Sequence, residues 1–125
     1  MEPDKNKILI VDDDKPLRRG LAMILKSIGY EPLEAENGKE ALKQVEEHHP
    51  ALIILDVMMK GISGLEVCRI LKTDTDTNAI KIIILSARGQ IIEKEEGLKA
   101  GADEYVTKPF DYKELIKKIK QLMDS

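Results

Sequence analysis

The chain has 125 residues, of which 42% are hydrophobic and 34% are charged, and its formal net charge at pH 7 is −3. This length fits a single domain over residues 1–125, and no stretch approaches the ~20 apolar residues that cross a bilayer. The negative charge argues against nucleic acid as a direct partner, and the charged N-terminus lacks the apolar core of a signal peptide, so we expect a cytoplasmic protein without a membrane span.

Strand and helix patterns alternate five times along the chain. The expected strands are short apolar runs, and the expected helices carry apolar residues at intervals of three and four. In chain order, we expect strands at residues 8–11, 31–35, 52–55, 82–85 and 105–107, each followed by a helix, at residues 17–28, 38–49, 65–72, 92–100 and 115–123. This alternation is typical of an α/β protein with a parallel sheet.

Polar residues and glycines mark the ends of these elements. Asp14 and Pro16 stand where the N-terminal cap and first turn of the first helix belong, and Gly29 follows its last turn. Gly61 and Gly64 bracket the loop before the third helix, where we expect them to serve turn geometry alone.

Three residues of types that often carry chemistry have plainer roles here. Cys68 lies in a helical pattern of apolar residues, and we expect a small buried hydrophobe rather than a reactive thiol. His48 and His49 end a charged stretch just before Pro50, and we expect them to form a solvated helix terminus.

The polarity of the strands predicts their order. The first, third and fourth strands are almost wholly apolar, so they should be buried on both faces at the centre of the sheet. The second contains Pro32, which lacks an amide donor and belongs at an edge, and the fifth opens with Asp103-Glu104. These properties predict a flavodoxin-like three-layer α/β sandwich with strand order 2-1-3-4-5. Right-handed crossovers then place helices one and five on one face and the other three on the opposite face.

Polar side chains follow four of these strands. Asp12 and Asp13 follow the first, Asp56 the third, Ser86 the fourth and Lys108 the fifth. Because ligands of such sheets bind outside the carboxyl ends of the strands, we expect these side chains to gather at one edge. Two carboxylates ~4 Å apart repel by about 4 kcal/mol at an effective dielectric near 20, so either one of them takes up a proton or a cation settles between them.

Oxygen ligands of this kind suit Mg²⁺, which also recruits a phosphate oxygen. With the metal bound, Asp56 would be free to attack as a nucleophile and form an aspartyl phosphate. Lys108 and Ser86 are the residues placed to hold the phosphoryl oxygens, one by charge and one by a hydrogen bond. The sequence therefore predicts a metal-assisted phosphoryl site.

Several segments of the chain resemble the signature of response-regulator receiver domains, the chemotaxis-regulator-like superfamily of two-component signalling. The resemblance extends over about residues 7–123 and is specific because its motifs occur together in this order: Val11–Asp14, Leu55–Met59, Leu85–Ala87 and Lys108–Phe110. It implies that Asp56 is the phosphorylated residue. It also implies that Asp13, Asp56 and the backbone carbonyl of Met58 ligate Mg²⁺, with Asp12 acting largely through water.

The resemblance assigns further roles around the phosphate. Ser86 would be the switch hydroxyl, Tyr105 the switch aromatic, and Lys108 the phosphate-binding lysine before a cis peptide bond to Pro109. Ala87 would leave room for the phosphate and the aromatic ring. One departure from the family pattern is Lys60, where receiver domains usually carry proline.

The implied function is that of a signalling switch rather than an enzyme. The domain would accept a phosphoryl group from a sensor histidine kinase or a histidine phosphotransfer protein. Phosphorylation would then remodel the surface of helix four, strand five and helix five, which a downstream target or a missing output domain would read. The resemblance is compatible with a monomer or with a dimer linked to phosphorylation.

Three other classes of protein remain open at this point. A haloacid-dehalogenase-like phosphatase also uses a strand-end aspartate, but it wants a second Asp where this chain has Met58. A flavodoxin-like FMN binder needs Ser, Thr and Gly in its first loop, where this chain has three aspartates. A phosphorylation-independent interaction module on the same fold is disfavoured by the intact set of Asp12, Asp13, Asp56 and Lys108, and an assay is needed to decide.

Overall fold

Five parallel strands form one sheet in the order β2-β1-β3-β4-β5, as the sequence predicts. The structure, a computed structural model, describes residues 3–59, 61–87 and 91–124, without the side chains of residues 87 and 91–94. The strands are β1 (Asp4–Val11), β2 (Glu31–Ala35), β3 (Pro50–Asp56), β4 (Lys81–Ala87) and β5 (Glu104–Lys108). The helices are α1 (Lys15–Ser27), α2 (Gly38–His48), α3 (Gly64–Thr73), α4 (Ile91–Lys99) and α5 (Tyr112–Met123).

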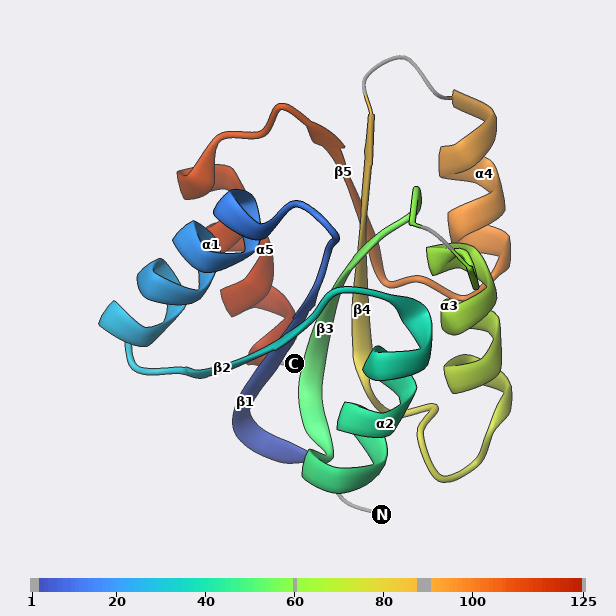
Figure 1. Cartoon of the computed structure of the whole chain (residues 1–125), viewed down its shortest axis with the longest axis horizontal. Coiled ribbons are helices and arrows are strands. Elements are labelled where there is room, and N and C mark those ends of the chain that lie inside the picture. The colour runs from blue at the N-terminus through green and yellow to red at the C-terminus, as the bar shows by residue number, and fades with distance from the viewer. Residues whose placement is uncertain (1–2, 60, 88–90, 125) are drawn as a thin grey trace.

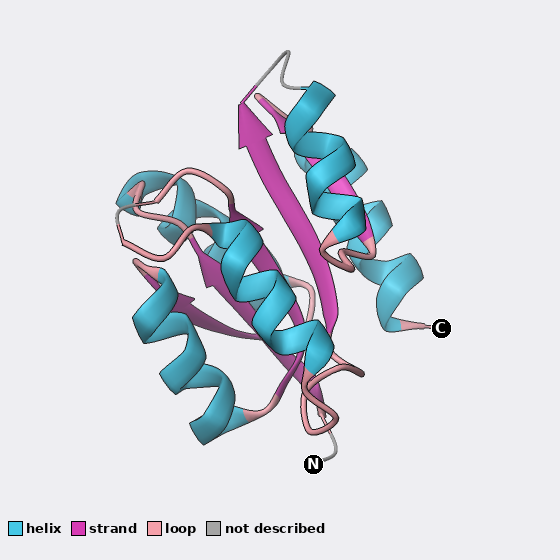
Figure 2. Ribbon diagram, turned by 90° about the vertical axis from the view of Figure 1, so that its right-hand side faces the viewer, coloured by secondary structure: helices cyan, strands magenta, loops and turns pink. Residues whose placement is uncertain are grey.

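Helices cover both faces of the sheet. In Figure 1, α1 and α5 lie on one side of the strands and α2, α3 and α4 on the other, and Figure 2 views the sheet from the second side. Successive strand residues alternate between two buried clusters: Ile8 and Ile10 pack toward α1 and α5, whereas Leu9 and Val11 pack toward α2 and α3. Because each fully buried Ile or Leu contributes about 1.5–3 kcal/mol, the apolar runs hold the three layers together.

The register of the sheet brings the strand ends level with one another. Val11 of β1 pairs with Leu55 of β3, so the next residues, Asp12 and Asp56, lie beside each other at the carboxyl ends of two central strands. On β4 and β5, Ser86 is in register with Thr107, and Lys108 follows at the end of β5. The residues singled out by the sequence therefore converge on one edge.

Short polar side chains fix where the helices begin. The side chain of Asp14 accepts a hydrogen bond from the Leu17 backbone N–H, and Asn37 caps α2 in the same way through Glu40. Gly29 follows α1 with a φ of 103°, in the left-handed region that favours glycine. The predicted start and end of α1 are confirmed.

Two strands begin at least two residues earlier than predicted. β1 starts at Asp4 rather than Ile8, and β3 starts at Pro50 rather than Leu52. The reason is a pairing that apolar periodicity does not reveal: Asp4 is opposite Pro50, and its N–H donates to the carbonyl of His49 at 2.6 Å. Polar residues at the start of β1 are exposed and carry no core signal.

The cysteine and histidine predictions have different outcomes. Cys68 is fully buried, as expected, and burial raises the pKa of its thiol to about 11, which makes it unreactive. His48 ends α2 and His49 follows with a φ of 50°, so the helix terminus is confirmed. The expectation that both are solvated holds for the His48 side chain, which is 37% exposed, but not for His49, whose Nδ1 is buried. Within the described part of the chain, no helix has the length and apolar character that crossing a bilayer requires.

Candidate functional site

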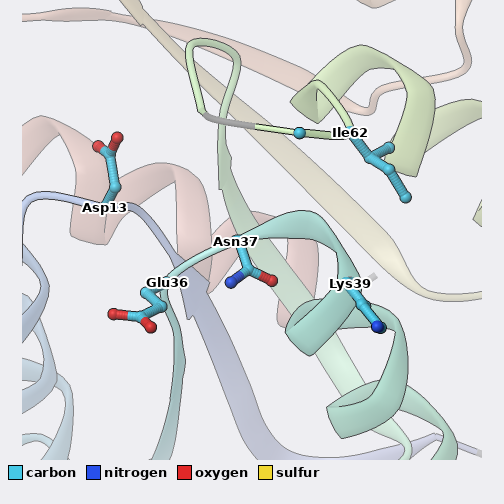
Figure 3. A pocket seen from close by; sticks show the side chains of 6 residues that line it. Asp13, Glu36, Asn37, Lys39 and Ile62 are labelled. Carbon is cyan, nitrogen blue, oxygen red and sulfur yellow. The ribbon is translucent and has the colours of Figure 1, made fainter.

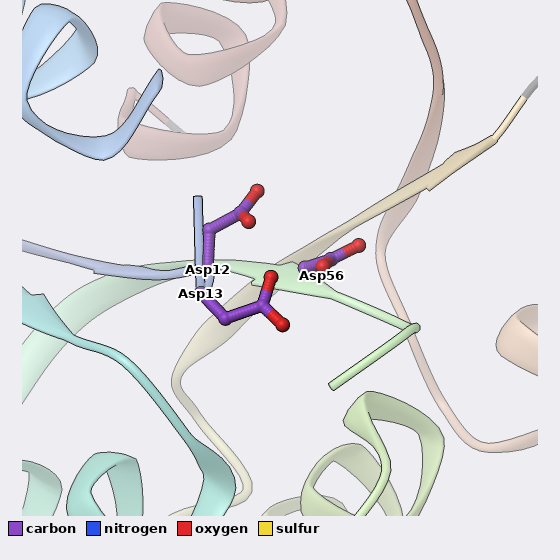
Figure 4. A group of neighbouring side chains, drawn as sticks. All are labelled: Asp12, Asp13 and Asp56. Carbon is purple, nitrogen blue, oxygen red and sulfur yellow. The ribbon is translucent and has the colours of Figure 1, made fainter. Parts of the chain in front are cut away.

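Three carboxylates from two neighbouring strands gather at the carboxyl edge of the sheet. Asp12 and Asp13 follow β1, and Asp56 ends β3 (Figure 4). One oxygen from each of these side chains lies within 4.8 Å of the others. Asp12 and Asp56 are buried, whereas Asp13 is exposed. The predicted acidic cluster therefore forms, with the spacing that a small divalent cation requires.

Lys108 reaches this cluster from the far edge of the sheet. Its Nζ lies 2.8 Å from Oδ2 of Asp12 and 3.4 Å from Oδ1 of Asp56. The peptide bond from Lys108 to Pro109 is cis, as the resemblance implies. One ammonium thus neutralises part of the charge of two buried carboxylates.

The surroundings of Asp56 and Lys108 determine the charge of each side chain. Burial, followed by the charge of Asp12, raises the pKa of Asp56 to about 6, and Lys108 and the Met58 backbone N–H offset only part of that rise. Burial lowers the pKa of the Lys108 ammonium, but its hydrogen bond to Asp12 and the charges of Asp56 and Asp12 outweigh burial and raise it overall. Near neutral pH, Asp56 is therefore ionised and Lys108 is charged.

The two members of the acidic pair differ in what their oxygens already bind. Oδ1 of Asp12 accepts the Asp14 backbone N–H at 2.9 Å, and Oδ2 accepts Lys108. Within the described residues, the Asp13 carboxylate has neither a hydrogen bond nor an ion pair. Among the three carboxylates, only that of Asp13 therefore has both oxygens open to a cation within the described residues.

The predicted switch residues lie on β4 and β5. Ser86 is fully buried near the end of β4. Tyr105 is half-buried and packs against the core on the α4 side, where its ring would meet a side chain added at Gly97. The side chain of Ala87 and the whole of Lys60 lie outside the described residues.

The two glycines between β3 and α3 have different roles, because the start of α3 lies close to the end of β3. Gly61 has a φ of 81°, so its expected turn role is confirmed. Gly64 is different: a Cβ there would overlap the backbone carbonyl oxygen of Asp56. The Gly64 N–H also donates to the carbonyl of Val57 at 3.2 Å. Gly64 therefore lets α3 begin directly against the backbone of the acceptor, and turn geometry is not its role.

An arginine near the site was not singled out from the sequence. Arg18 is buried, and one of its terminal nitrogens donates to the backbone carbonyl of Asp12 at 2.8 Å. The sequence does contain a sign that Arg18 is buried. It lies three residues before Leu21 and seven before Leu25, which places it on the buried stripe of α1.

A cleft opens beside the acidic cluster. It encloses 710 Å³ between the loops that follow β1, β2 and β3, and it is lined by Asp13, Glu36, Asn37, Lys39, Gly61 and Ile62 (Figure 3). Because Asp13 belongs both to the cleft and to the cluster, the exposed member of the cluster faces this opening. A solvated ion or a donor group can reach the carboxylates from here.

Comparison with known proteins gives the same family throughout. The family model for the response regulator receiver domain matches residues 8–120. The phosphate regulon transcriptional regulatory protein PhoB of Pseudomonas aeruginosa is 47% identical over 116 residues, which are 93% of this chain and 51% of PhoB. Histidine kinase P4 of Formosa agariphila is 46% identical over 124 residues, 99% of this chain and 9% of the kinase. The chain thus spans about half the length of PhoB and a small part of the kinase.

Solved structures agree in fold over the whole chain. A putative response regulator from Chloroflexus aurantiacus superposes with a TM-score of 0.91 at 35% identity, covering 99% of this chain and 100% of that one. The response regulator protein TrrA from Thermotoga maritima, solved in complex with Mg(2+)-BeF, gives a TM-score of 0.82 at 40% identity and covers 98% and 99%.

Proposed function

The chain belongs to the response regulator receiver domain family, and from this membership we propose that it is a phosphorylation switch with Asp56 as the phosphoryl acceptor. One observation carries the proposal. Asp56 is a buried carboxylate beside the acidic pair of β1, and the Lys108 ammonium lies 3.4 Å from its Oδ1. A phosphoryl group on Asp56 would therefore have the Lys108 ammonium within reach. The neighbouring carboxylates of Asp12 and Asp13 are suited to holding a second cation, a metal ion.

We propose Mg²⁺ as the second cation. Asp13, Asp56 and the backbone carbonyl of Met58 would ligate it directly, and Asp12 would act through water because both of its oxygens are already bonded. These donors are all oxygen atoms, which Mg²⁺ prefers, and TrrA in complex with Mg(2+)-BeF supports the assignment by relationship. When bound, the ion supplies positive charge that screens the phosphoryl oxygens from the carboxylates.

The transfer itself needs only the groups of this site and a donor. A carboxylate oxygen of Asp56 attacks the phosphorus of a phosphohistidine; a P–O bond forms as the P–N bond breaks, and the imidazole leaves with the electron pair and then takes a proton. Lys108 and Ser86 bind the phosphoryl oxygens, the first by charge and the second by its hydroxyl. Acetyl phosphate would transfer its phosphoryl group in the same way, with acetate as the leaving group.

The phosphorylated state would be read on the surface of α4, β5 and α5. Ser86 would move toward the phosphate and Tyr105 would turn inward on the same side of the sheet. A full shift between two states needs about 5.5 kcal/mol of differential stabilisation, which a metal-clamped and lysine-paired phosphate can supply. The proposed upstream partner is a sensor histidine kinase or a histidine phosphotransfer protein. The proposed downstream partner is a separate target protein or an output domain, and similarity to the transcriptional regulatory protein PhoB supports the second of these.

The test is the intact mass of the protein after incubation with acetyl phosphate and Mg²⁺. We expect one added phosphoryl group, absent with EDTA and absent in Asp56→Asn. Asp76→Asn, a change at an exposed aspartate before β4, is the matched control and should be modified like the wild type. Binding of beryllium fluoride with Mg²⁺, followed by calorimetry, tests the same site without a phosphodonor. A protein that takes up neither group would instead be a phosphorylation-independent interaction module.

A further inference from the structure

Every hydrogen-bonding group of Asp12 has a partner. Its N–H donates to the carbonyl of Ala35, its two carboxylate oxygens accept Asp14 and Lys108, and its backbone carbonyl accepts Arg18 at 2.8 Å. The last contact concerns the peptide group between Asp12 and Asp13. Because a peptide is planar, a fixed carbonyl of Asp12 also fixes the N–H of Asp13 and the direction in which the Asp13 chain continues.

We propose that Arg18 is a positioning residue for the metal site: by holding this peptide, it aims the Asp13 carboxylate at the cation. The inference rests on the proposed function, because it assumes that Asp13 ligates Mg²⁺. Asp13 is exposed and, within the described residues, its carboxylate has no partner of its own. The position of the Asp13 carboxylate therefore depends on its backbone, which Arg18 holds through the hydrogen bond to the Asp12 carbonyl.

Arg18 is itself held in one position. Its side chain is only 10% exposed, and its Nε donates to Oε1 of Glu34 at 2.9 Å while a terminal nitrogen reaches Asp12. The planar guanidinium thus connects β2 to the end of β1 through two donors in fixed geometry. A lysine at this position has a single ammonium on a flexible stem and cannot reproduce both contacts in the same geometry.

Positioning and simple electrostatics predict opposite results when the charge of Arg18 is removed. A positive charge near a cation site repels the cation, so its loss alone would tighten Mg²⁺ binding. Loss of a residue that orients a ligand weakens metal binding, typically by about 10–100-fold. The sign of the change in affinity therefore distinguishes the two roles.

Arg19 is the matched control. Its Nε lies 3.2 Å from the same Oε1 of Glu34, but its side chain is 62% exposed and makes no contact with Asp12 among the described residues. Replacement of Arg19 removes the same charge as replacement of Arg18, together with a contact to the same glutamate. It leaves the Asp12–Asp13 peptide bound to Arg18.

The experiment is calorimetric titration of Mg²⁺ into the wild type, Arg18→Met, Arg18→Lys and Arg19→Met at one ionic strength. We expect the Kd of Arg18→Met to rise about tenfold, that of Arg18→Lys to rise less, and that of Arg19→Met to stay within about twofold of the wild type. In the metal-free protein, the amide NMR signal of Asp13 should shift in both Arg18 variants and stay in place in Arg19→Met.

Folded Arg18 variants that bind Mg²⁺ as tightly as the wild type, or more tightly, would overturn the inference. Unfolding curves establish that each variant is folded. If Arg18→Met does not fold, Arg18→Lys decides alone, since it keeps the charge and loses the geometry. A wild-type protein that binds no Mg²⁺ would overturn the proposed metal site itself, which is a different outcome from unchanged affinity in the Arg18 variants.

Discussion

The Lys108 ammonium lies closer to Asp12, at 2.8 Å, than to Asp56, at 3.4 Å. Asp12 is fully buried, so in the unphosphorylated protein this lysine serves first as the counter-ion of Asp12. Its contact with Asp56, the proposed acceptor, is longer. Lys108 thus has a structural role in the resting state that is separate from its proposed role toward phosphate.

Replacement of Lys108 by methionine should destabilise the metal-free protein. Removal of one partner of a buried ion pair leaves an uncompensated charge, and because Lys108 is partly exposed we expect a loss of about 2 kcal/mol in the free energy of unfolding. Urea denaturation in EDTA measures this loss. Lys113→Met, at an exposed position in the first turn of α5, is the control and should change stability by less than about 0.5 kcal/mol.

Asp56→Asn should stabilise the metal-free protein near neutral pH. The carboxyl of Asp56 has its pKa raised from 3.8 to about 6 in the fold, so its ionisation costs stability as pH rises through this range. The cost is absent below about pH 3 and complete above about pH 7. At ~1.36 kcal/mol per pKa unit, the gain from asparagine is about 2–3 kcal/mol at pH 7.5.

Urea unfolding of Asp56→Asn and wild type in EDTA, at pH 4.5 and pH 7.5, tests this dependence. The difference between the two proteins should be about a third as large at the lower pH as at the higher one. Asp76→Asn should show no such dependence. An equal difference at both pH values would mean that the Asp56 carboxyl is not destabilised by its surroundings.

Asp13→Asn should separate metal binding from folding. Because Asp13 is exposed and unpaired within the described residues, its change should leave the metal-free stability within about 0.5 kcal/mol of the wild type. A ligand at 100 times its Kd stabilises the wild type by about 2.7 kcal/mol, and this gain should be lost in the variant. Thermal unfolding with and without Mg²⁺ measures both quantities, and a variant that keeps the gain would exclude Asp13 as a ligand.

Gly64→Ala should damage both the fold and the acceptor. Its Cβ would overlap the carbonyl oxygen of Asp56, so the backbone of one loop must move, at a cost of about 1–3 kcal/mol. Phosphorylation by acetyl phosphate should slow as well, since the acceptor is displaced. Gly61→Ala, where a Cβ meets open space but φ is positive, should cost only about 1 kcal/mol. If Gly64→Ala and Gly61→Ala lose the same stability and are phosphorylated at the same rate, the close approach of Gly64 to Asp56 is not what requires glycine at position 64.

The fold and the acidic cluster could be predicted because both depend on local patterns. Apolar runs identify buried strands, Pro32 identifies an edge, and parallel strands place their terminal residues on one side. Arg18 and Gly64 could not be assigned in this way, because their roles depend on distances between elements. The early start of β1 was missed for a related reason: its backbone pairing at Asp4 uses residues without apolar side chains.

The hydrogen bond between Asp12 and Lys108 joins residues that are 96 positions apart in the sequence. The lysine comes from β5, an edge strand with a single neighbour, whereas the carboxylates come from the interior of the sheet. Detachment of β5 alone would leave β1 and β3 paired. It would, however, remove the Lys108 ammonium, which offsets part of the negative charge of Asp12 and Asp56. Any partner that loosens or clamps this one border strand would therefore govern the reactivity of Asp56 without touching it.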